Sequence, residues 1–154
     1  MTWMLLATLL GAAGAFASLT QETGRAATPS PFAGSWVADL SQSRLDPKMP
    51  IQAADLKIAV NGNVITLASS FTLPGGQTQS ESETLRADGT ETAATLIPGV
   101  IHVANWVGPH VLALIARKGN QNIALITYDI SADGQTLTAR TSGLVEQMVV
   151  FRRR

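Results

Sequence analysis

Two carboxylates in the polar segment 77–86 (QTQSESETLR) are the side chains most suited to chemistry. Leu85 is the only apolar residue there, and if it faces a protein interior, strand alternation places Glu81 and Glu83 on the same face, roughly 7 Å apart. Such a pair could bind a cationic or polyhydroxylated ligand. With one pKa raised by burial, it could also serve a barrel enzyme of the isomerase or cyclase type. The alternatives are an edge strand that leaves both carboxylates in water, or the opposite parity, which lines the interior with Ser and Thr.

The two histidines, His102 and His110, flank Trp106, and His102 and Trp106 share one face of their segment. The sequence has no Cys, and two His residues without an aligned third ligand do not define a zinc site. Neither a Gly-x-Ser-x-Gly elbow nor a glycine-rich phosphate loop is present. We therefore assign no catalytic residue, no metal and no cofactor from the sequence.

Composition excludes several partners. The chain has 154 residues, the size of one domain, with 11 basic and 11 acidic side chains and a formal charge of zero. A chain with no net charge lacks the excess of basic residues that binds nucleic-acid phosphates, and the basic run 152–154 is too short to change this. Hydrophobic residues make up 45% of the chain, which is sufficient for a packed core.

The N-terminal segment has the pattern of a signal peptide. Residues 4–17 are apolar or small, too short to span a bilayer, and end in the small-x-small pattern that signal peptidase recognises. Cleavage after Ala17 defines a signal peptide over 1–17, a flexible leader over 18–31 and a folded domain over 32–154. The mature protein is then periplasmic or secreted, without a membrane anchor. The alternative is an N-terminal helix that stays as an anchor.

From Phe32 onward the sequence predicts strands joined by tight turns. Short runs rich in Val, Ile, Thr and Leu alternate with turn formers such as Asn61-Gly62 and Ala132-Asp133-Gly134. The expected strands are 34–39, 55–61, 63–73, 77–86, 100–107, 110–118, 122–130, 135–142 and 145–152.

Serial hairpins without crossover helices favour an all-β fold. An antiparallel up-and-down meander removes its exposed edges by closing, so we expect an eight- or nine-stranded barrel. The long connection 40–54 holds Pro47 and Pro50, which exclude a regular helix. Its expected place is a loop or short helical turn over one end of the barrel.

Segments 100–107, 110–118 and 122–130 are apolar on both faces, so their outer face needs a cover. The cover is either the long connection or the leader, or else a second copy of the chain in a homo-oligomer. The second case describes an envelope structural or interaction module that works through its outer face.

A short motif at the first strand points to a family. Gly34-x-Trp36 resembles the signature of lipocalins and the wider calycin barrels, and with SADGQTLT at 131–138 the chain resembles small exported lipocalin-like proteins of bacteria of uncharacterised function. The resemblance implies that Trp36 plugs the closed end of the barrel, that Gly34 lets the chain bend beneath it, and that an Arg from the barrel's end lies on the indole. Arg152 is our candidate for that Arg, with Arg140 second.

The resemblance also implies a cup for a small ligand, and apolar inner faces favour a mostly apolar molecule. We expect that an interior site would use Phe71, Glu81, Glu83, His102, Trp106, Tyr128 and Met148.

Overall fold

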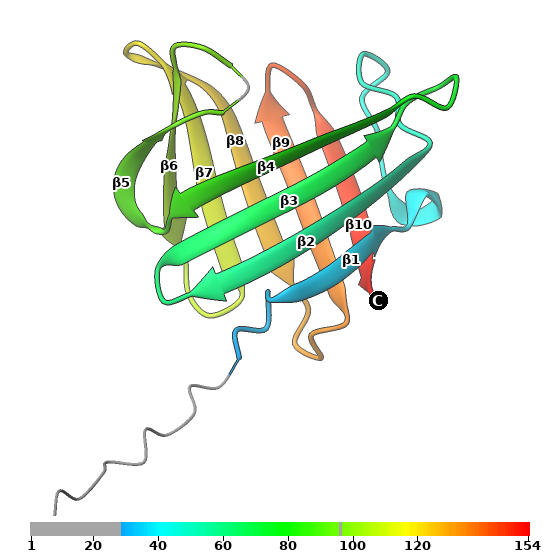
Figure 1. The fold of residues 1–154 in the computed structure, drawn as a ribbon, viewed down its shortest axis with the longest axis horizontal. Helices are drawn as coiled ribbons and strands as arrows, with labels where there is room; N and C mark the ends of the chain where they lie inside the picture. Colours follow the sequence, from blue (N-terminus) through cyan, green and yellow to red (C-terminus); the bar gives the residue numbers. More distant parts are fainter. Residues whose placement is uncertain (1–28, 96) are drawn as a thin grey trace, which may run out of the picture.

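The computed structural model describes residues 29–95 and 97–154, so the predicted signal peptide and nearly all of the leader lie outside the described residues. Within this part, ten antiparallel strands follow one another along the chain (Figure 1). One short 3-10 helix, η1 (Leu40–Gln42), follows the first strand. The strands are β1 (Gly34–Ala38), β2 (Ala53–Asn61), β3 (Val64–Thr72), β4 (Thr78–Arg86), β5 (Asp88–Ala93), β6 (Val100–Trp106), β7 (Val111–Lys118), β8 (Gln121–Ile130), β9 (Thr136–Gly143) and β10 (Gln147–Arg153).

The sheet curls into a nearly closed barrel, as predicted (Figure 1). Its hydrogen-bonded order is β4-β3-β2-β1-β10-β9-β8-β7-β6-β5, so the first strand pairs with the last. The register places Trp36 opposite Arg153. The two ends of this order, β4 and β5, are consecutive along the chain and meet at Ala87. The fold is therefore an all-β antiparallel meander that almost closes on itself.

The sequence predicted eight or nine strands, and the additional one is β5. Its sequence, DGTETA, has no apolar alternation, and a bulge between Asp88 and Glu91 interrupts its pairing with β6. Polar strands of this kind are held by backbone hydrogen bonds to a neighbour, here β6, rather than by an apolar face of their own. Hydrophobic periodicity therefore could not predict it.

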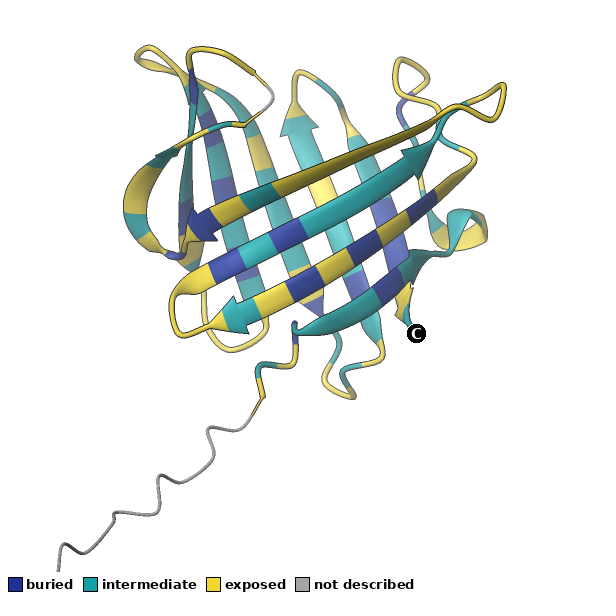
Figure 2. Cartoon of the chain, viewed as in Figure 1, coloured by how far each residue is buried: buried dark blue, intermediate teal, exposed yellow. Residues whose placement is uncertain are grey.

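The inner face of the barrel is built from alternate residues along each strand. In β2, the buried residues Ala54, Leu56 and Ile58 alternate with exposed ones, and the same banding is visible on β2 in Figure 2. In β3, Ile65 and Leu67 are buried. These side chains belong to one cluster that also includes residues of β1, β4 and β6–β10. The described residues contain no helix long and apolar enough to cross a membrane.

The connection after β1 passes over one end of the barrel, as expected. After η1 the chain forms an isolated bridge between Arg44 and Met148 of β10. Asp46, 8% exposed, then accepts hydrogen bonds from the backbone N–H of Lys48 (2.8 Å) and of Glu146 (2.9 Å). These bonds hold the pKa of Asp46 below its ordinary value, with the Glu146 contact the larger cause. One carboxylate therefore joins two segments at this end of the barrel, which we call the mouth.

The opposite end is closed by aromatic side chains. Trp36 is 1% exposed, and its indole N–H donates to the carbonyl of Phe32 at 3.1 Å. Phe32 packs against Trp106 with ring centroids 5.1 Å apart. The guanidinium of Arg153 lies 4.2 Å from the centroid of the Trp36 ring. It also donates to the carbonyls of residues 31, 33 and 134. We call this group of side chains the floor.

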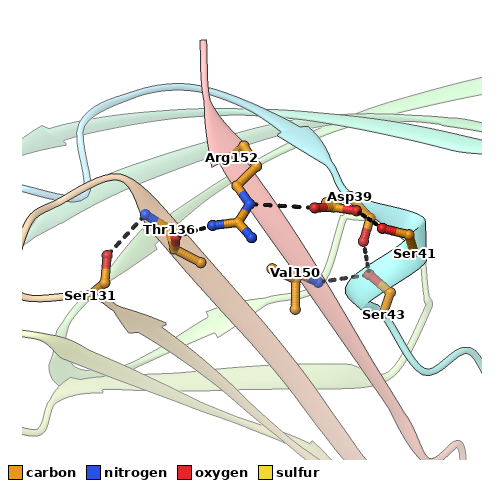
Figure 3. A network of polar contacts seen from close by, with 7 residues as sticks. All are labelled: Asp39, Ser41, Ser43, Ser131, Thr136, Val150 and Arg152. Carbon is orange, nitrogen blue, oxygen red and sulfur yellow. Dashed lines mark hydrogen bonds and ion pairs between the residues drawn. The ribbon is translucent and has the colours of Figure 1, made fainter.

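The cation that lies on the Trp36 ring is thus Arg153. The sequence had predicted Arg152, with Arg140 as the second candidate, and both predictions were wrong. Arg153 stands opposite Trp36 and shares its face, so the next residue back, Arg152, projects outward. There Arg152 donates to the carboxylate of Asp39 (3.4 Å) and to the hydroxyl of Thr136 (2.8 Å), as Figure 3 shows. Arg140 lies on β9 and is exposed.

Candidate functional site

A cavity of about 900 Å³ opens at the mouth. It lies between the 48–51 segment, the mouth ends of β2, β3 and β4, and the start of β10. Most of its wall is apolar, which suits a small-molecule site of ordinary size, about 300–1,000 Å³. Its lining residues are Lys48, Met49, Pro50, Ile51, Ala54, Phe71, Leu73, Pro74, Gln79, Ser80, Glu81, Gln147, Val149 and Phe151.

Two of the predicted site residues, Phe71 and Glu81, are in this lining. Phe71 stands opposite Gln79 in the register, and Ser69 stands opposite Glu81, so all four side chains face the interior. The Ser69 hydroxyl donates to Oε1 of Glu81 at 3.1 Å. The inward parity of Leu85, one of the alternatives left open by the sequence, is the parity that the structure has.

The second carboxylate, Glu83, pairs with a predicted partner on another strand. Nδ1 of His102 donates to Oε1 of Glu83 at 2.5 Å. Only 19% of the Glu83 side chain and 12% of the His102 side chain are exposed. The contact joins β4 to β6, beside the gap where the two ends of the sheet meet. A carboxylate and an imidazole therefore form a partly buried polar pair on the inner wall.

Tyr128, another predicted site residue, faces the same space. It stands opposite Leu112 of β7 and Ala139 of β9, and Leu112 is part of the buried core. Burial raises the pKa of the Tyr128 hydroxyl to about 12, and the negative charges of Glu83 and Glu81 contribute to the increase. The ring is half-buried and does not line the large cavity. No hydrogen bond of its hydroxyl is found among the described residues.

Two predicted wall residues lie elsewhere. Trp106 is on the inner face but at the floor, packed on Phe32, away from the large cavity. Met148 was predicted wrongly, because it points outward. It stands opposite the exposed Arg140 and helps line a shallow outer depression, whereas its neighbour Val149 is buried inside. The β10 strand is apolar on both faces, so its sequence alone leaves the parity open.

The outer face of β6–β8 remains partly uncovered within the described residues. Val103, Ile115 and Leu125 stand in one row across these strands, and Leu125 is 43% exposed. The 40–52 connection reaches β10 instead of this face. His110 is exposed in the turn before β7. Residues 29–95 and 97–154 contain no group of three or more His, Asp or Glu side chains that could hold a metal ion.

Sequence reasoning missed the residues that form the mouth. Met49, Pro50 and Ile51 come from an irregular connection, and Val149 and Phe151 come from a strand that is apolar on both faces. The odd polar strand 77–86 was the signal that could have located the cavity, because it contributes Gln79 and Glu81 to the wall.

Comparisons with known proteins define the class of fold. No protein-family model matches the chain, and no curated protein does. Solved structures do match. The fluorescent protein UnaG is 18% identical, with a TM-score of 0.60 over 80% of this chain and 97% of that chain. A fatty acid binding protein of Schistosoma mansoni, in complex with arachidonic acid, is 14% identical, with a TM-score of 0.59 over 81% and 97%.

A third structure, the fatty acid transporter REP1-NXSQ, is 14% identical, with a TM-score of 0.54 over 79% of this chain and 95% of that chain. At these identities the likeness concerns the fold. The chain shares the up-and-down β-barrel fold of these three proteins, which is the fold that the sequence predicted. Its resemblance to the exported bacterial lipocalin-like proteins stays a prediction.

Proposed function

We propose that the chain binds a small, mostly apolar molecule inside its barrel. The cavity of about 900 Å³ at the mouth carries this proposal. Its wall includes Ala54, Phe71 and Val149, which offer an apolar body a place out of water. The proposal is also supported by two proteins with the same fold, the fatty acid transporter and the Schistosoma fatty acid binding protein, because a fatty acid is a mostly apolar molecule.

Titration with Nile red, a neutral apolar dye, tests the proposal. We expect saturable binding at one site and a blue-shifted emission. Ala54 lines the cavity and is 2% exposed, so Ala54→Phe fills part of the space and should weaken binding at least roughly tenfold. Ala53 is its outward, exposed neighbour on the same strand, so Ala53→Phe is the matched control and should bind like the wild type.

Urea unfolding of both variants confirms that each one folds. The proposal fails if the dye does not bind the folded wild type. It also fails if Ala54→Phe, folded, binds the dye as well as the wild type does.

We also propose export to the periplasm or the medium, on the basis of residues 4–17. Expression of the full chain in a bacterium with an active signal peptidase, followed by N-terminal sequencing, tests this. We expect the mature chain to start at Ser18. Replacement of Ala15 and Ala17 by a bulky residue should block cleavage, since the peptidase accepts only small side chains there. An uncleaved wild-type chain in the cytoplasm would contradict the proposal.

A further inference from the structure

Resting on the proposed function, we propose that the ligand carries a cationic amine head group, which the interior carboxylates Glu81 and Glu83 receive. A fatty-acid carboxylate would be disfavoured. The proposal depends on which side chains face the interior and on which of their polar atoms have no protein partner.

The inner wall presents acceptors without a protein donor. Oε1 of Glu81 accepts from Ser69, and Oε1 of Glu83 accepts from His102. Among the described residues, neither carboxylate's second oxygen has a hydrogen-bond partner, and neither does the hydroxyl of Tyr128. The Glu83 side chain is only 19% exposed, so its second oxygen has lost part of the hydration that a ligand N–H could replace, whereas Glu81 is exposed beside the cavity. An ammonium group brings three such donors and a compensating charge.

Cations in the described interior lie at its two ends. Arg153 is engaged at the floor by Trp36 and three backbone carbonyls. Lys48 is exposed at the rim of the mouth. The wall between them holds Glu81 and Glu83, with His102 as the one basic group in contact with them. A carboxylate ligand that enters past Lys48 would meet like charge.

Tyr128 adds a third polar group to the inner face of the barrel. The ring of Tyr128 is half-buried, and its hydroxyl has no hydrogen-bond partner among the described residues. It faces the same space as the two carboxylates, whose charges act on it. A ligand amine near the carboxylates could donate to its oxygen, which would satisfy the group.

Three ligands of equal chain length test the proposal through displacement of Nile red at neutral pH. Dodecylamine, dodecanol and dodecanoate share their apolar body, so differences between them report the head group. We expect dodecylamine to bind roughly tenfold or more tightly than dodecanoate, with dodecanol between them. In Glu81→Gln and in Glu83→Gln the advantage of the amine over the alcohol should fall several-fold, while dodecanol affinity stays unchanged.

Asp129→Asn is the matched control, because it removes an exposed carboxylate from the outer face of β8, and it should leave the advantage of the amine in place. Unchanged dodecanol affinity also shows that each variant is folded. The proposal is overturned if dodecanoate binds as tightly as dodecylamine, or if both carboxylate variants keep the full advantage of the amine. If the dye binds but only dodecanoate displaces it, apolar binding stands and the head group is wrong. If neither the dye nor any of the three compounds binds, the proposed function itself fails.

Discussion

The backbone of Gly34 lies so close to Arg153 that a Cβ atom on Gly34 would come within 2.6 Å of the guanidinium Nη1. Gly34 also has a φ of +143°, which side-chain-bearing residues rarely adopt. The glycine of the Gly34-x-Trp36 motif therefore makes room for a side chain from the other end of the chain. That side chain covers the indole of Trp36 and closes the floor.

Gly34→Ala should destabilise the barrel by about 2–3 kcal/mol, because it adds backbone strain and displaces Arg153. Urea unfolding followed by Trp fluorescence measures this. In an Arg153→Met background the steric part of the cost disappears and only the strain at φ +143° remains, so the two changes should be less than additive. Full additivity would mean that Gly34 and Arg153 do not interact.

Arg153→Met should cost about 2–4 kcal/mol of unfolding free energy. The methionine keeps much of the apolar stem but loses the cation–π contact with Trp36 and the hydrogen bonds to three carbonyls. Arg152→Met is the matched control on the outer face, where its exposed ion pair with Asp39 is screened by water and contributes little to stability. Equal losses in the two variants would contradict the assignment of Arg153 to the floor.

The resemblance predicted that an Arg lies on the Trp36 ring, but it did not predict which Arg of the chain this is. Choosing between Arg152 and Arg153 requires the register between β1 and β10, which depends on how the whole meander closes. A slip of one residue exchanges the inner and outer faces of a strand. Nothing local in the terminal run of three arginines fixes that choice.

Tyr128 is the only tyrosine of the chain, so its phenol can be titrated by absorbance alone. We expect phenolate absorbance to appear near pH 12 in the folded protein and near pH 10 in urea. The folded pKa is raised, so the contribution of Tyr128 to stability is constant below pH 10 and decreases as the pH rises from 10 toward 12. Glu83→Gln should lower the folded pKa, because it removes one of the charges that raise it. A midpoint near 10 in the folded protein would place the hydroxyl in water.

Asp46→Asn should loosen the mouth. The carboxylate accepts one backbone N–H on each oxygen, whereas an amide offers one oxygen and turns its NH₂ group toward the other donor. The Asp46 pKa is depressed, so its contribution to stability is full above the ordinary value of 3.8 and disappears as the pH falls through the lower folded value. Amide proton shifts of Lys48 and Glu146 should therefore titrate together below pH 3.8. In Asp46→Asn this inflection should be absent, and its persistence would show that another group titrates.

The alternation of side chains along a strand predicted part of the candidate site. The rest depends on how the barrel closes. Placing Leu85 inside was enough to place Glu81 and Glu83 inside, since parity within one strand is a local property. The contact of Glu83 with His102 joins strands that only closure of the barrel brings together. Met148 shows the limit, because a strand that is apolar on both faces gives alternation no contrast to use.

The most direct test of the account locates a bound ligand. A neutral hydrocarbon that carries a nitroxide spin label broadens the NMR signals of nearby methyl groups. With the chain methyl-labelled, we expect the strongest broadening at Leu73 and Val149 in the cavity wall, and little at Ile115 and Leu125 on the outer face. Broadening at Ile115 and Leu125 that leaves Leu73 and Val149 sharp would contradict interior binding and place the working surface outside the barrel.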